Sequence, residues 1–230
     1  MVLESLIPVR LAERKPIEML PLAFLYASLA IFIALWIFPN HASLTTVFFT
    51  VMALLPLMVS LMRFEEESVF KKNVDYDVNH KRAMPFFVWM FLGMVLAYSL
   101  WFVAFPQSLV NNLFSVQINT IQAINNNINQ VTANAISVSS YFMAVLVNNL
   151  KVLLFVLLFS FIYGAGAIFI LTWNASVVAV AIGNTARKAI AGYAGSAGIT
   201  GVSAYFAGFS LGLLRYMIHG IPEIGAYFVG

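Results

Sequence analysis

MPFFVWMFLGMVLAYSLWFVAF, residues 84–105, carries no charged side chain. A helix needs about 20 mostly apolar residues to cross the hydrocarbon core of a bilayer. The stretch therefore predicts a membrane-spanning helix. Trp89 and Trp101 lie near its two ends, where indole rings are enriched at the membrane interface.

Two similar stretches precede it, and they predict two earlier spans. The first covers 19–38 and ends before Pro39-Asn40, and the second covers 45–62. Pro56 lies inside the second stretch, where a proline removes a helical hydrogen bond and is expected to kink the helix.

The composition of the whole chain supports a membrane class. Of 230 residues, 62% are hydrophobic and only 9% are charged, whereas soluble domains carry about 25% charged residues. There is no cysteine, which excludes disulfides and thiolate metal sites. The net charge of +3 comes from basic residues that flank apolar stretches, so membrane topology explains it and no nucleic-acid partner is expected.

The basic residues predict the orientation of the first half. They gather in the N-terminal segment and in the loop 63–83, and the turn near Pro39 has none. The positive-inside rule places both basic segments in the cytoplasm, so we expect a multi-pass protein of the cell membrane with a cytoplasmic N-terminus. We interpret 63–83 as a solvated juxtamembrane helix, because Glu67 precedes Lys71 by four residues. A docking role for this loop is the alternative.

The stretch 106–143 is uncharged and rich in Asn, Gln, Ser and Thr, and three spans place it outside the cell. A stripe of apolar residues repeats at intervals of three and four: Ile121, Ile124, Ile128, Val131 and Ala135. Three interpretations remain open: an amphipathic helix packed on the protein's own outer surface, a homodimer contact through 118–136, or Asn-rich disorder.

The second half contains two further expected spans, 144–173 and 199–218. The stretch 175–198 between them is short and broken by glycines, so it predicts a re-entrant piece or an extension of the fourth helix. It carries Arg187 and Lys188, which suggest a return to the cytoplasm. In the fifth span small residues repeat every four positions and predict close helix packing: Ala204, Gly208 and Gly212.

The C-terminal run MIHGIPEIGAYFVG, 217–230, holds His219, Pro222 and Glu223 in apolar surroundings. A carboxylate at membrane depth is costly and marks a functional candidate. We weigh three roles for the pair: a structural cap or buried polar network, a protein-contact or gating site, and catalysis. One His and one Glu are insufficient for a metal site, so neither a metal nor a cofactor is expected. The apolar run after Glu223 suggests a truncated sixth span or a tail folded back on the bundle.

Several short motifs follow one another over 145–230. An Asn pair precedes a Gly-containing apolar helix, a further Asn follows it, and a His-Gly-x-Pro-Glu element comes last. The motif residues are Asn148, Asn149, Asn174, His219, Gly220, Pro222 and Glu223. In this order the motifs resemble those of the stage II sporulation protein M family. The resemblance implies a multi-pass membrane anchor without catalysis that gathers partner proteins. Ala175 and Ile218 depart from the Gly and Pro of the family pattern.

We therefore predict an all-α, polytopic transmembrane bundle of five clear spans. Its parts are a three-span region over 1–106, an Asn-rich extracytoplasmic segment over 107–144, and a sporulation-protein-M-like region over 145–230. The predicted function is a non-enzymatic scaffold for other membrane or extracytoplasmic proteins in the lipid bilayer. A transporter or channel that uses His219 and Glu223 is one alternative, and an intramembrane hydrolase is another.

Overall fold

The computed structural model describes residues 15–72, 76–123 and 165–196, together with 207 and 210. Within these ranges the chain is helical apart from short turns, with no strand. Four helices are long and apolar enough to cross a membrane: Pro16–Ile37, Pro39–Arg63, Met84–Ala104 and Ile168–Ala191. The all-α prediction is confirmed for the described residues, and the helices agree with a membrane class.

The first two helices form an antiparallel hairpin close to the predicted one. A short 3₁₀ turn, η1 (Pro16–Glu18), leads into α2 (Met19–Ile37). A second 3₁₀ turn, η2 (Pro39–His41), starts α3 (Ala42–Lys72). Proline suits the first position of a helical turn because its missing N–H would have no partner there. Pro56 lies within α3, which continues as one helix on both sides of it.

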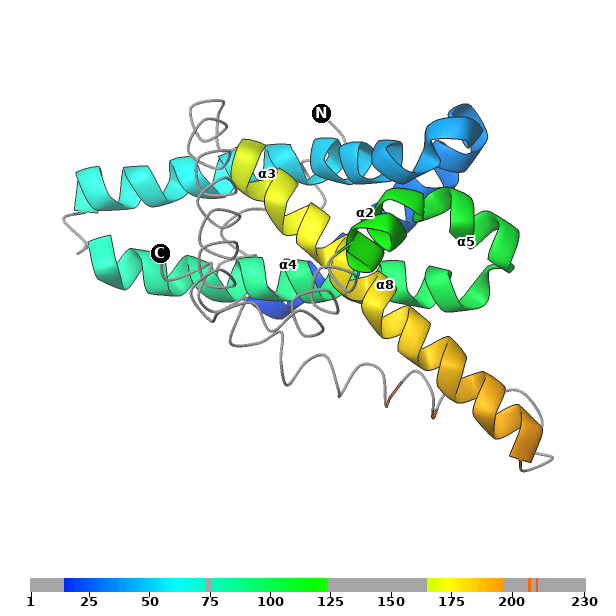
Figure 1. Cartoon of the computed structure of the whole chain (residues 1–230). Helices are drawn as coiled ribbons and strands as arrows, with labels where there is room; N and C mark the ends of the chain where they lie inside the picture. The colour runs from blue at the N-terminus through cyan, green and yellow to red at the C-terminus, as the bar shows by residue number, and fades with distance from the viewer. Residues whose placement is uncertain (1–14, 73–75, 124–164, 197–206, 208–209, 211–230) are drawn as a thin grey trace, which may run out of the picture.

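The third predicted span, 84–105, lies within α4 (Tyr76–Ala104) except for its last residue. The predicted juxtamembrane loop 63–83 is helical on both sides of residues 73–75, because α3 extends to Lys72 and α4 begins at Tyr76. In Figure 1 these extensions of α3 and α4 run side by side, away from the rest of the bundle.

The start of the Asn-rich segment packs across one end of the bundle. It comprises α5 (Gln107–Leu113) and a further helical stretch, 115–123, and we call residues 107–123 the strap. The buried residues of the strap repeat at intervals of three and four: Val110, Leu113, Phe114 and Gln117. Ile121 packs half-buried against the same core. The rest of the apolar stripe, from 124 on, and most of the proposed dimer segment lie outside the described residues.

The last described helix, α8 (Ala165–Ser196), corrects the predicted layout of the second half. We expected a span to end at residue 173, but the helix continues through Asn174 to Ser196. Of the two interpretations of 175–198, the described part agrees with an extension of the preceding helix and not with a re-entrant piece. Gly183 lies within this helix, and its missing side chain leaves room for the ring of Phe102 on α4. A helix interior tolerates such a glycine when packing requires it.

α8 runs in the same direction as α4. Thr172 contacts Met94 in the middle of α4, and Arg187, further along α8, contacts Phe102 and Phe105 at the end of α4. Arg187 and Lys188 therefore lie at the end of the bundle opposite to the extensions around residues 73–75, as Figure 1 shows for the end of α8. We expected both residues on the cytoplasmic side, together with the 63–83 loop, whereas the structure places them and the described parts of that loop at opposite ends of the bundle.

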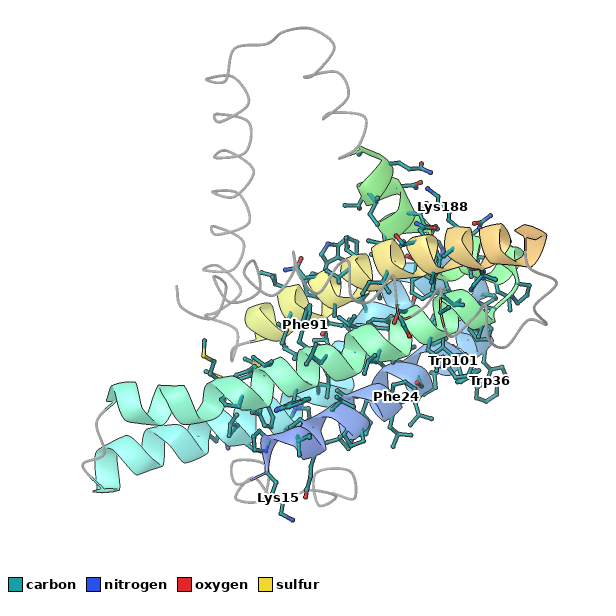
Figure 2. All side chains as sticks on the ribbon, turned by 90° about the horizontal axis from the view of Figure 1, so that it is seen from below. Lys15, Phe24, Trp36, Phe91, Trp101 and Lys188 are labelled. Atoms are coloured by element: carbon teal, nitrogen blue, oxygen red, sulfur yellow. The ribbon has the colours of Figure 1, made fainter. Side chains whose placement is uncertain are left out.

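The core lies where α2, α3 and α8 pack around α4. A Cβ atom added at Gly93 would overlap the backbone oxygen of Leu20, so α2 and α4 approach closely at this point. Large apolar side chains on the outer faces of α2 and α3 are exposed, including Leu29, Trp36 and Phe48. Figure 2 shows Trp36 and Trp101 near the same end of α2 and α4.

Candidate functional site

Of the predicted site residues, the structure describes one. Asn174 is half-buried in the interior of α8, so it does not follow the end of a helix as the motif order led us to expect. The remaining predicted residues lie outside the described part of the chain: Asn148, Asn149, Ala204, Gly208, Gly212, His219, Gly220, Pro222 and Glu223. Their roles stay predictions.

The polar groups that the structure does bring together centre on Gln117 of the strap. Its side chain is 1% exposed and lies between α3 and α8. The Ser43 hydroxyl donates to Gln117 Oε1 at 2.8 Å, and Gln117 Nε2 donates to Ser176 Oγ at 3.2 Å. The backbone N–H of Val116 also donates to Ser43 Oγ at 3.3 Å. The Gln117 amide thus joins the strap to α3 and to α8, and both of its polar atoms are paired although the residue is buried.

A second buried polar group lies further along the same face of α3. The Tyr98 hydroxyl, fully buried on α4, donates to Thr50 Oγ1 at 2.7 Å. Thr50 in turn donates to the backbone oxygen of Thr46 at 2.9 Å. Ser43, Thr46 and Thr50 are three and four residues apart, so they share one face of α3. The residue Thr46 is 2% exposed, and its hydroxyl has no hydrogen-bond partner.

Arg187 ties α8 to the end of α4 and the start of the strap. Its guanidinium donates to the backbone oxygen of Phe102 at 3.0 Å, to that of Phe105, and to Gln107 Oε1 at 2.6 Å. It also lies 5.4 Å from the centre of the Phe102 ring. The last carbonyls of a helix have no partner within it and carry partial negative charge. A cation that binds them holds the three segments in a fixed relation.

Trp101 has a packing role that the sequence did not indicate. We expected an interfacial anchor, and the structure places its half-buried ring against α2, where Nε1 donates to Ser28 Oγ at 2.9 Å. The ring stacks on Phe105 at 5.0 Å between centres and meets Phe32 edge-on at 4.8 Å.

The sequence offered little to single out these groups. Gln117 is one of several amides in an uncharged stretch, and isolated serines and threonines in apolar helices have no spacing that marks them. Only the continued repeat of buried positions from Val110 to Ile121 carries a signal, because Gln117 falls on that stripe.

The described groups are uncharged hydrogen-bonding side chains with one paired arginine. Such an arrangement can hold helices together or bind a small polar molecule, and it offers no side chain arranged as nucleophile and base. Among the described residues, no three His, Asp or Glu side chains gather in a way that would hold a metal ion. Compared with protein-family models, curated proteins and solved structures, the chain matches none of them.

Proposed function

We propose that the protein is an integral membrane scaffold that organises partner proteins and does not itself carry out chemistry. The observation that carries the proposal is the filled centre of the bundle. Tyr98, Phe102 and Phe114 are each at most 1% exposed there. Tyr98 meets Phe114 at 6.4 Å between ring centres, and Phe102 meets it at 5.3 Å. Because aromatic side chains fill the centre of the bundle, the arrangement supports a structural role more than a transporter or channel with a water-filled path.

The parallel course of α4 and α8 supports a span count of at least five. Two helices that cross in the same direction require the chain to return across the membrane between them. The connecting residues 124–164 include the apolar stretch 144–163, which is long enough for that crossing. With the N-terminus in the cytoplasm, α8 then ends outside. A crossing by 199–218 would be the sixth and would place His219 and Glu223 on the cytoplasmic side, opposite to the side the sequence suggested.

Cysteine labelling tests this topology directly, since the chain has no cysteine of its own. Gln107, Lys188 and Arg63 are exposed and suit single substitution. We expect Gln107→Cys and Lys188→Cys to react with a membrane-impermeant thiol reagent from one side of the membrane, and Arg63→Cys from the other. Labelling of Lys188→Cys from the same side as Arg63→Cys would contradict the parallel arrangement.

The resemblance to the stage II sporulation protein M family supports the scaffold proposal through motif residues alone. In this proposal Asn148 and Asn149 help to hold the second half together. His219 and Glu223 form or support the partner contact. The partner is another membrane protein or a protein bound at the membrane surface.

Co-purification from native membranes in mild detergent tests the scaffold. The intact chain is compared with a His219→Ala, Glu223→Gln double variant at matched expression. The matched control is Leu29→Ala, which changes an exposed apolar residue of α2. We expect a stoichiometric partner with the intact chain and the control, and its loss from the double variant. A well-folded protein that purifies alone in all three samples would contradict the scaffold and favour transport assays.

A further inference from the structure

α8 has a face that points away from its contacts with α3 and α4. The side of α8 that packs on these helices holds fully buried residues, among them Thr172, Ala179 and Ala186. Another set of residues follows at intervals of seven and four, so its members share a different side of the helix. All four are half-buried, and we call them the outer face of α8: Asn174, Ala181, Thr185 and Ala189.

Three residues of the outer face allow another helix to approach closely. Ala181, Thr185 and Ala189 repeat every four residues, the spacing of small side chains at which membrane helices pack most closely. The Thr185 hydroxyl donates to Ala181 O at 3.1 Å, so its polar group is already paired within α8. The outer face therefore suits an apolar helix that carries small residues of its own.

Asn174 requires a polar group on that helix. It lies within the apolar part of α8, Ile168–Ala191, and no described residue forms a hydrogen bond with its side chain. The hydrocarbon of a bilayer offers no water to an amide, so asparagine side chains in spans bond to polar groups of neighbouring helices. The helix that covers the outer face is thus expected to carry a hydrogen-bonding side chain at the depth of Asn174.

The stretch 199–218, which follows α8 in the chain, has the matching repeat. Its small residues are also four apart, at Ala204, Gly208 and Gly212. Ala207 and Ser210, the two described residues of this stretch, are helical and half-buried. α8 ends at residue 196, so only a short connection separates the two helices. Helices joined by a short connection pack side by side and antiparallel.

The register of such a pair follows from the residue numbers. If the chain reverses where α8 ends, the two small-residue repeats come level: Ala189 with Ala204, Thr185 with Gly208, and Ala181 with Gly212. His219 then comes level with Asn174, because it follows the reversal by as many residues as Asn174 precedes it. An imidazole can donate or accept a hydrogen bond, as the amide of Asn174 can.

We infer that residues 199–218 dock as an antiparallel helix on the outer face of α8, and that Asn174 positions His219 through a hydrogen bond between amide and imidazole. Asn174 is then a positioning residue for the contact assigned above to His219 and Glu223. The role of His219 in that contact rests on the proposed function, whereas the docking does not. A chain that purifies without a partner would contradict the scaffold and leave both tests below unaffected.

Pairs of introduced cysteines test the docking and its register. We expect a disulfide within one chain for Ala181→Cys with Gly212→Cys, and for Ala189→Cys with Ala204→Cys, because facing positions bring two Cα atoms within about 7 Å. The crossed pairs, Ala181→Cys with Ala204→Cys and Ala189→Cys with Gly212→Cys, use the same four substitutions about two helical turns out of register and should not link. After oxidation in membranes, a maleimide polymer labels only the cysteines that remain free. No link in the facing pairs, an equal yield in the crossed pairs, or links only between two chains would overturn the docking.

The chemical reactivity of His219 tests its pairing with Asn174. Diethyl pyrocarbonate acylates the unprotonated ring nitrogen of histidine, which a hydrogen bond from the amide would occupy. With Asn174→Leu we expect the rate at His219, followed by mass spectrometry, to rise about fivefold, the factor that one ordinary hydrogen bond contributes. Asn174→Gln, which keeps the amide, should recover part of the protection. Asn184→Leu, half-buried on another side of α8, is the matched control, and the exposed His41 is the internal reference. An unchanged rate for Asn174→Leu, or an equal rise for Asn184→Leu, would overturn the pairing.

Discussion

Two interfaces of the bundle are held in different ways. Between α2 and α4 the contact is made mainly by small and apolar groups, with Leu20, Ala23 and Gly93 at a point of close approach. Between α3, α8 and the strap it is made by polar side chains around Gln117. Within a lipid bilayer the hydrophobic effect does not drive apolar helices together, so close packing and hydrogen bonds must hold them in contact. This protein uses close packing between α2 and α4, and hydrogen bonds between α3, α8 and the strap.

This difference predicts which kind of substitution should destabilise each interface. A contact made by shape fails when volume is added, because backbone atoms cannot move aside without separating whole helices. A contact made by hydrogen bonds fails when one partner is removed and the other is left buried. Added volume should therefore lower the free energy of unfolding most at the α2–α4 interface. Removal of a hydrogen-bonding group should lower it most at the interface between α3, α8 and the strap.

The largest effect is expected from Gly93→Ala. The new Cβ would overlap the Leu20 carbonyl oxygen, and α2 must move away from α4. The free energy of unfolding should fall by about 3 kcal/mol, the upper range for overpacked cores. Gly183→Ala is the comparison variant: its Cβ would overlap the buried ring of Phe102 and not a helix backbone, so a loss is expected here too, and it should be smaller than for Gly93→Ala. Thermal unfolding in detergent measures both, and equal losses would remove the distinction between them.

Arg187→Met should have the next largest effect. It leaves the carbonyls of Phe102 and Phe105 without their charged donor. Hydrogen bonds to charged groups contribute about 1.5–3 kcal/mol. Arg187→Lys should recover only part of the lost stability, because an ammonium group cannot reproduce the several fixed N–H donors of the planar guanidinium. Lys188→Met, at an exposed neighbouring position, should change stability by less than about 0.5 kcal/mol. A loss for Lys188→Met as large as for Arg187→Met would indicate general sensitivity of this helix end.

Gln117→Leu tests the polar interface with a side chain of similar size. The Ser43 and Ser176 hydroxyls each lose a partner, although Ser176 still donates to Trp173 O at 2.7 Å. The expected loss is about 1–2 kcal/mol. Hydrogen exchange of residues 107–123 should rise with it, and the exposed Gln122→Ala should leave exchange unchanged. Unaltered protection in Gln117→Leu would show that the apolar face of the strap holds it without the amide.

The smallest effect is expected from the hydrogen bond between Trp101 and Ser28, which joins α4 to α2. A double-mutant cycle of Trp101→Phe and Ser28→Ala should give a coupling of about 0.6 kcal/mol, the average for side-chain bonds between membrane helices. A coupling well above that of the Gln117–Ser43 pair would reverse the proposed contrast between the two interfaces.

The sequence predicted the first three helices well and the last one poorly, and the reason is physical. Uncharged stretches of about 20 residues bounded by Pro39 and by basic segments indicate a span on their own. The stretch after Asn174 contains glycines and basic residues that normally end a span, and only the structure shows that Gly183 lies within the helix and leaves room for the ring of Phe102. The role of Gln117 likewise depends on two serines distant in sequence, a relation that no local pattern contains.

The contact of Arg187 has a consequence for how this protein can vary. Two of its acceptors are backbone oxygens, which every residue type supplies at positions 102 and 105. A substitution on α4 at these positions keeps the acceptors, so no compensating change at 187 is needed to preserve those two bonds. Correlated substitution between the two helices should accordingly be concentrated at Gly183 and Phe102, where one side chain occupies the space that the other residue leaves open.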